Sequence, residues 1–222
     1  GVMFVSPQIF RHIEVLYDQS LHLRAYHAAQ AIAPLEEWEG TAARILAGRL
    51  AATVGAPNLG RKHQLLAYRH DPKDWEARYY YARIILRYRG PIAAWQFLRQ
   101  HDDDSTLATA DPKIYSDWLA FHAFVLAQLR DFERTEHWLA QAEKVAPENV
   151  WVWVERAKVF ELQGRYEDTL SVLRYALILQ PWFRPTIQTS ARALVQQGRE
   201  EEALRLLAQA PQRIECACLV EH

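Results

Sequence analysis

The side chains most often used for catalysis and metal binding are scattered along this chain. Its nine histidines include no pair four residues apart, the spacing that would place two imidazoles on one face of a helix. Cys216 and Cys218 stand two residues apart, so on a helix they point in different directions, which disfavours a disulfide between them. We interpret them as free thiols, which favours a reducing compartment, and we expect a cytoplasmic protein.

A run of three aspartates at residues 102–104 is a further candidate for cation binding. The ligands of a calcium loop alternate along the chain, and these do not, so we interpret them as loop residues and helix caps. The sequence also lacks GxSxG, HExxH and CxxC motifs and a glycine-rich phosphate loop. We therefore predict no cofactor, no metal site and no enzymatic activity in this segment.

A repeat of 34 residues organises the chain instead. Small residues recur at this step at Ala123, Ala157 and Ala191, and leucines recur at Leu139, Leu173 and Leu207. A fixed period of this length predicts stacked helical hairpins. Earlier in the chain the same step joins Gly48 to Ala82 and Gly60 to Ala94, and an inserted loop at 101–112 separates the two registers.

The copy between Pro147 and Pro181 shows what each position does. Ala157 is small where the first helix of the hairpin presses on the second, because a larger side chain would force them apart. Gly164 is predicted to end the first helix in the left-handed conformation. Pro181 stops the second helix, since it lacks an N–H and clashes with the preceding turn.

This pattern resembles the tetratricopeptide repeat. The residues that match the family motif are Trp153, Ala157, Phe160, Gly164, Tyr166, Leu173, Ala176 and Pro181, whereas Thr169 stands where alanine is usual. The resemblance implies an all-α fold, a right-handed α-solenoid of about six helix-turn-helix repeats. We expect one domain over residues 1–222, with repeats at 6–34, 36–72, 73–101, 112–147, 149–181 and 183–211 and a terminal helix at 212–222.

The resemblance also implies a place for a ligand, because the first helices of such hairpins line a concave groove. Carrying the groove positions over gives candidate peptide-binding residues at Arg49, Tyr79, Arg83, Phe124, Trp151, Lys158, Gln188 and Arg192. The basic residues would form charge-assisted hydrogen bonds, and the aromatic residues would supply pockets. We expect the partner to be a protein or peptide with acidic side chains or a carboxylate end.

The charge balance excludes other classes of partner. The formal net charge is −1, with 26 basic and 27 acidic residues, which disfavours general binding to nucleic acid or to a membrane surface. No apolar run reaches the roughly 18–20 residues needed to span a bilayer. We therefore predict no nucleic-acid partner and no membrane insertion.

Two alternatives to a scaffold remain open. The chain ends in an apolar segment, RIECACLVEH, rather than a polar cap, so we expect a fragment of a longer protein. It would then be the docking region of a larger multidomain enzyme, such as a peptidase. The other alternative is a closed α/α-toroid enzyme, which needs paired carboxylates, for which Glu76 and Glu161 are candidates; the 34-residue step favours an open solenoid instead.

Overall fold

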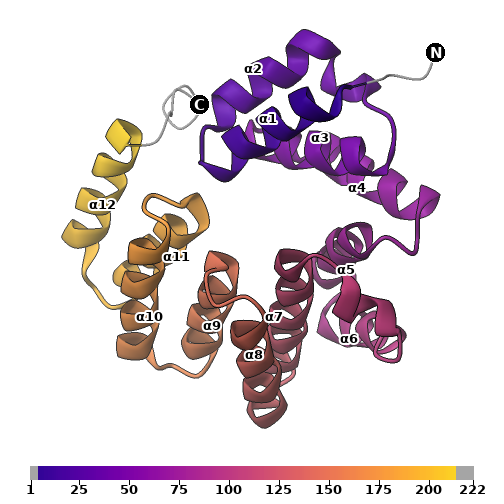
Figure 1. Cartoon of the computed structure of the whole chain (residues 1–222). Helices are drawn as coiled ribbons and strands as arrows, with labels where there is room; N and C mark the ends of the chain where they lie inside the picture. Colours follow the sequence, from indigo (N-terminus) through magenta and orange to yellow (C-terminus); the bar gives the residue numbers. More distant parts are fainter. Residues whose placement is uncertain (1–4, 214–222) are drawn as a thin grey trace. The chain divides into compact units, whose positions relative to one another are not determined.

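The structure, a computed structural model, describes residues 5–213. Within these residues twelve α-helices follow one another, joined by turns and two short 3-10 helices, and there is no strand (Figure 1). The chain is therefore all-α, as the repeat predicts. The helices are α1 (Pro7–Asp18), α2 (His22–Ile32), α3 (Thr41–Thr53), α4 (Pro57–His70), α5 (Trp75–Arg89), α6 (Pro91–Arg99), α7 (Pro112–Gln128), α8 (Phe132–Val145), α9 (Val150–Leu162), α10 (Tyr166–Leu179), α11 (Arg184–Gln196) and α12 (Glu200–Arg213).

Local signals in the sequence set many of the helix ends. Ser6 caps α1 by accepting a hydrogen bond from the backbone N–H of Ile9, with Pro7 in the first turn. Gly164 follows α9 with φ +70° and Gly198 follows α11 with φ +73°, the left-handed conformation that glycine adopts without strain. The helix stop expected at Gly164 is confirmed, and Gly198 ends α11 in the same way.

Only some of the C-terminal residues covered by the prediction are described by the structure. Helix α12 continues to Arg213, beyond the predicted end of the sixth repeat at 211. Apart from residues 212 and 213, the predicted terminal helix at 212–222 lies outside the described residues. Cys216 and Cys218 lie outside them as well.

The described residues group into two compact units, where the sequence predicts one domain. The first unit comprises residues 5–81 together with 208–213, and the second comprises residues 82–207. The boundary falls inside α5, between Tyr81 and Ala82. Each unit has its own buried cluster and is described by itself.

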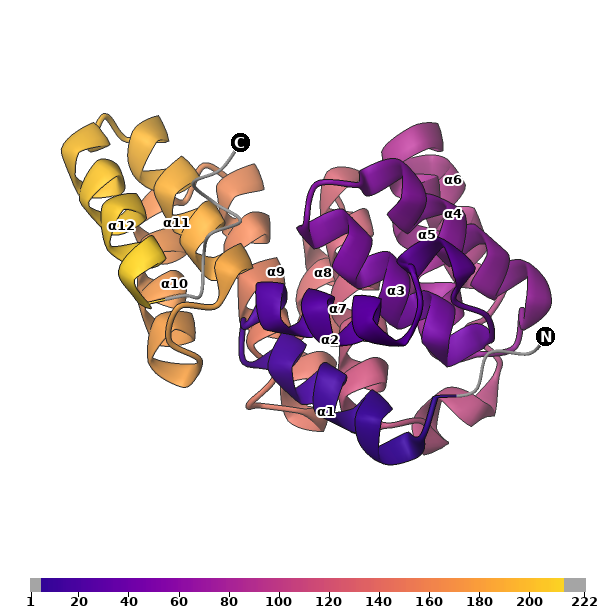
Figure 2. The same ribbon diagram turned by 90° about the horizontal axis from the view of Figure 1, so that it is seen from above.

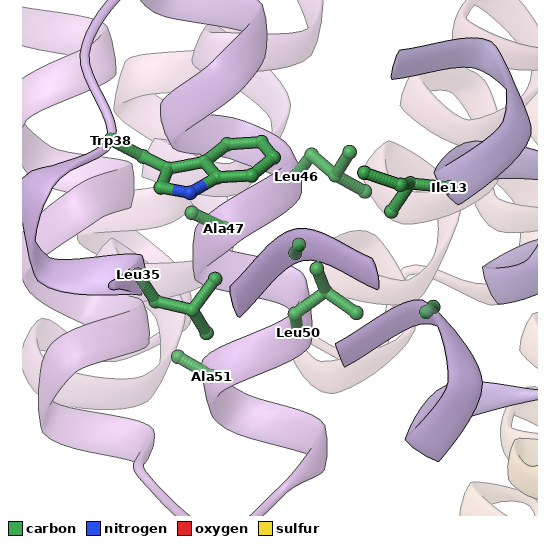
Figure 3. Close-up of a cluster of buried hydrophobic side chains, with 9 residues drawn as sticks. Ile13, Leu35, Trp38, Leu46, Ala47, Leu50 and Ala51 are labelled. Atoms are coloured by element: carbon green, nitrogen blue, oxygen red, sulfur yellow. The ribbon is translucent and has the colours of Figure 1, made fainter. Parts of the chain in front are cut away.

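In the first unit, a core cluster joins α1, α2 and α3 through a short connecting segment (Figure 3). Trp38 is 1% exposed, and its indole N–H donates a 3.0 Å hydrogen bond to the carbonyl oxygen of Ala33. This burial shapes residues 33–40 into a 3-10 turn, η1 (Leu35–Glu37), followed by Gly40 at φ +97°. Helix α3 therefore begins at Thr41, five residues after the predicted start of the second repeat at residue 36.

Two glycines allow α3 and α4 to approach closely. A Cβ atom built on Gly60 would lie 2.7 Å from the carbonyl oxygen of Gly48, and one on Gly48 would lie 3.0 Å from that of Gly60. Backbone therefore contacts backbone at this crossing. Alanine or threonine occupies the position of Gly60 in the later hairpins, so this hairpin is the one whose sequence permits direct backbone contact.

In the second unit, the departure from the family motif at Thr169 has a structural role. Its hydroxyl donates to the carbonyl oxygen of Arg165 at 2.9 Å and lies 3.5 Å from that of Ala157, on the first helix of the hairpin. Thr135 makes the same pair of contacts one repeat earlier, with Asp131 and Ala123. A threonine at this position therefore ties the second helix to the first while remaining small enough for the crossing.

Successive hairpins of the second unit are joined by buried apolar side chains and by one charge network. Helices α10, α11 and α12 lie side by side, with Leu173, Leu194 and Ala203 in a shared cluster (Figure 2). Between α8 and α9, Arg156 donates two hydrogen bonds to Glu136, at 2.8 and 2.9 Å, and a third to Glu143. Burial disfavours the charge of Arg156, but these hydrogen bonds outweigh it and raise the pKa.

The glycine contact predicts an unusual response to alanine. Glycine to alanine normally stabilises a helix by about 1 kcal/mol, but Gly60→Ala should destabilise the protein by about 1–3 kcal/mol, because the new Cβ atom overlaps the α3 backbone. Urea unfolding of the variant measures this, with the exposed Lys62→Ala on the same helix as the control. A Gly60→Ala variant as stable as the parent would contradict the crossing geometry.

Candidate functional site

The eight predicted groove residues are divided between the two units. Arg49 and Tyr79 belong to the first unit; the second unit contains Arg83, Phe124, Trp151, Lys158, Gln188 and Arg192. All six of the second set lie on the first helices of their hairpins, α5, α7, α9 and α11. We call these six residues the first-helix face.

Arg49, in the first unit, is engaged by its own chain. Its guanidinium lies 3.5 Å from the carboxylate of Asp18 and 4.2 Å from the ring centroid of Tyr17. Burial disfavours its charge, but Tyr80, Tyr17, Glu76 and Asp18 outweigh burial and raise its pKa. Its role in the structure is to hold α3 against the end of α1.

Tyr79 is a packing residue of the same unit. It is only 8% exposed, and its ring meets that of Tyr80 edge-on at 5.1 Å. Such a pair contributes to stability through burial and ring geometry. Little of the Tyr79 side chain is therefore accessible to a ligand.

In the second unit, aromatic contacts join three of the first helices. The guanidinium of Arg83 on α5 lies 5.6 Å from the ring centroid of Trp151 on α9 and 5.8 Å from that of Phe121 on α7. Trp151 in turn meets Phe183, just before α11, edge-on at 5.4 Å. Arg83 therefore lies between aromatic rings, an arrangement stabilised by cation–π attraction.

The other two cations of the first-helix face are paired with carboxylates. Lys158 donates a 2.7 Å hydrogen bond to Glu155, and its ammonium lies 4.6 Å from the ring centroid of Phe124. Arg192 on α11 contacts Glu161 on α9 at 2.8 Å. Each predicted cation thus already has an anionic or aromatic partner in its own chain, so a ligand carboxylate must compete for it.

Comparison with known proteins finds a repeat family in the C-terminal part of the chain. The family model described as Tetratricopeptide repeat matches residues 160–214, which include α10, α11 and α12. This part of the chain is tetratricopeptide repeat sequence. No curated protein sequence matches it significantly.

Two solved structures resemble the fold of this chain. A thermophilic TPR protein of Thermus thermophilus has 20% sequence identity and a TM-score of 0.54, over 80% of this chain and 93% of that one. PilF of Pseudomonas aeruginosa has 12% identity and a TM-score of 0.50, over 92% of this chain and 90% of that one. At such identities the likeness concerns the fold alone.

Sequence reasoning missed some of the residues that complete the first-helix face. Phe121 and Phe183 contact Arg83 and Trp151 respectively, yet neither falls on a groove position of the repeat. Glu155 is also off register and is only 3% exposed beside Lys158. A signal was present for Glu155, because an acid three residues before a lysine on a helix predicts an ion pair.

The residues considered for catalysis have structural roles where they are described. Glu161 pairs with Arg192, and Glu76 is among the groups that stabilise the charge of Arg49. Asp104 and Asp111 cap η2 (Ser105–Thr109) and α7, in line with the interpretation of the acidic loop as caps. Within residues 5–213, no three His, Cys, Asp or Glu side chains gather closely enough to hold a metal ion.

The first unit also contains a pocket that the sequence did not indicate. It has a volume of about 410 Å³ and lies between α1 and the start of α3, lined by residues that include Phe10, Glu14, Gly40 and Ala43. Burial raises the pKa of the Glu14 carboxyl above its ordinary value, against the opposing charge of Arg11.

The described helices include none with the length and hydropathy needed to cross a membrane.

His122, on α7, is buried and stacks on Trp138 of α8, with ring centroids 3.9 Å apart. Its Nδ1 atom has no hydrogen-bond partner, and Asp102 lies 3.9 Å away, beyond hydrogen-bond distance. Burial, with a contribution from the charge of Arg134, lowers the pKa of His122 to about 4. The folded protein therefore holds this imidazole in its neutral form.

This burial predicts a loss of stability in acid. Because the folded pKa lies below the unfolded value, protonation favours the unfolded chain as the pH falls through 6.5 toward 4. Between pH 7.5 and pH 5 the effect is about 2 kcal/mol. Urea unfolding at both pH values should show this extra loss in the parent and not in His122→Phe, which keeps a ring on Trp138. Equal pH dependence in the two proteins would show that His122 is not held neutral.

Proposed function

We propose that this chain is an interaction scaffold without chemistry of its own, which binds an extended peptide or protein segment across its first-helix face. The proposal is supported by the family and by the continuity of that face. Contacts pass from Arg83 to Trp151, from Lys158 to Phe124, and from Arg192 to Glu161, so side chains of α5, α7, α9 and α11 lie next to one another. A segment lying across these helices would meet all of them.

The face combines two features that suit recognition of a peptide. Its aromatic rings offer apolar area at low entropic cost, and its charges are held in place before a ligand arrives. Phe124 and Trp151 are half-buried, so each keeps part of its ring accessible. Gln188 is exposed and lies one helical turn before Arg192, on the same side of α11.

Arg192 is where we propose an acidic group of the ligand would bind. Its side chain is 52% exposed, so an incoming carboxylate can reach the guanidinium beside Glu161 and share its hydrogen bonds. Lys158 is 20% exposed, and Arg83 is held between aromatic rings. Both side chains are therefore less accessible to a ligand carboxylate than Arg192. The acidic character of the partner remains a prediction from the sequence.

Site-specific photo-crosslinking tests this proposal. A photoreactive residue at Gln188, in the full chain in lysate of the source cells, should capture a protein segment. Arg192→Glu should lower the yield of that adduct about tenfold, because it places a negative charge beside Glu161 and the incoming acid.

A well-matched control is available in Arg165→Glu. Arg165 is 50% exposed and pairs with Asp168 at 2.9 Å, much as Arg192 pairs with Glu161, but it precedes a second helix, α10. The control should leave the adduct unchanged, and circular dichroism should show equal helicity in both variants. Equal yields from the two variants, or no adduct from position 188, would contradict binding at this face.

A further inference from the structure

A second surface differs in its charges from the rest of the chain. Residues 77–101 contain five arginines and no aspartate or glutamate, although the whole chain has a net charge of −1. The part of this stretch in the second unit forms the C-terminal half of α5, the Gly90-Pro91 turn and all of α6. Six of its residues define what we call the α5–α6 patch: Arg87, Tyr88, Arg89, Ile92, Trp95 and Arg99.

The arginines of this patch are exposed and lack ion-pair partners. Arg87, Arg89 and Arg99 are all exposed, and none of them belongs to an ion pair among the described residues. The backbone N–H of Asp102 donates to the carbonyl oxygen of Arg99, and the charge of Arg99 lowers the pKa of Asp102 against the larger effect of burial, but the two side chains form no ion pair. Arginines elsewhere in the unit, such as Arg165, Arg192 and Arg199, each contact a carboxylate. The positive charge of the patch is thus largely uncompensated.

The start of α6 adds to this positive potential. A helix N-terminus has a partial positive charge, which an acidic residue in the first turn can offset. Helix α6 has no such acid, as is also true of α7, α9 and α11 in the same unit, so this charge is not offset within its first turn. The N-terminus of α6 lies directly after Arg87 and Arg89 in the chain, so the three positive features coincide at the turn.

Apolar side chains are exposed beside these charges. Ile92 is 62% exposed and Tyr88 is 56% exposed. Ile92, Trp95 and Arg99 follow one another at steps of three and four residues, so they share one face of α6, and the Arg99 guanidinium lies 4.7 Å from the Trp95 ring centroid. The exposed isoleucine and tyrosine beside these arginines make the patch an amphipathic surface.

We propose that the α5–α6 patch is a second docking surface, which binds an acidic segment of a partner protein that also presents an apolar side chain to Ile92. Charge complementarity requires an anionic partner. Arginine, tyrosine and tryptophan are the residues most enriched in the energetic centres of protein interfaces. Arginine also holds carboxylates through two parallel hydrogen bonds.

Other anionic partners fit the patch less well. Nucleic-acid bases stack on open aromatic faces, but Arg99 lies over Trp95, and Arg87 lies 5.7 Å from the Tyr88 ring centroid. Segments that bind anionic lipid usually present about four to eight basic residues, and here three are exposed. The test distinguishes both of these partners from a protein.

The test places a photo-crosslinking residue at Ile92 in the full chain, in lysate of the source cells. The control position is Ile178, which is 79% exposed on α10. We expect position 92, and not position 178, to capture a peptide with more Asp and Glu than Lys and Arg. Arg87→Glu/Arg89→Glu should lower that yield about tenfold through like-charge repulsion. Arg165→Glu/Arg199→Glu, which reverses two paired arginines, should leave it unchanged.

Several results would overturn this inference. They are a neutral or basic captured peptide, an adduct with nucleic acid, a yield that survives the charge reversal, or no adduct above that of position 178. Cosedimentation with phosphatidylserine vesicles, lost in Arg87→Glu/Arg89→Glu, would assign the patch to lipid instead. Arg192→Glu should not affect the position 92 adduct, so failure here and failure of the first-helix face are separate outcomes.

Discussion

The close approach of the two helices within each hairpin is the constraint on which the rest of the structure depends. In the hairpins from α3 onward the first helix presents a small residue at the crossing, as at Gly48 and Ala157, and the second presents another, as at Gly60 and Thr169. The repeat therefore places small residues at the same two positions of these hairpins. The crossing fixes the rotation of each helix about its own axis. It therefore also determines which side chains of the first helices lie together.

The first-helix face follows from this geometry. With α7, α9 and α11 held at regular spacing, residues on successive first helices meet, as Arg192 and Glu161 do at 2.8 Å. Those internal contacts satisfy the cations that the repeat places there. Arg87 and Arg89, at the turn between α5 and α6, form no ion pair with any residue in the described part of the chain. The two surfaces thus offer different chemistry: a face with paired charges and aromatic rings, and a patch with uncompensated positive charge.

How much the sequence predicts depends on how local each feature is. The helix stop at Gly164 depends on neighbouring residues and is predicted correctly, as is the all-α fold from its 34-residue period. The late start of α3 depends on where Trp38 packs. The spacing of apolar residues along the chain does not reveal that position. For the site, the repeat register identifies which residues lie on first helices, but not their partners: Arg192 and Glu161 are 31 residues apart in sequence.

The hairpin crossing can be tested most directly at Ala157, which is fully buried where α9 meets α10. Urea unfolding of Ala157→Leu should show a loss of about 3 kcal/mol or more, because the added carbons have no space between the helices. The control, Arg174→Leu, adds a leucine at an exposed position of α10 and should change stability by less than about 0.5 kcal/mol. An Ala157→Leu variant as stable as this control would contradict the account of the fold and of the faces it positions.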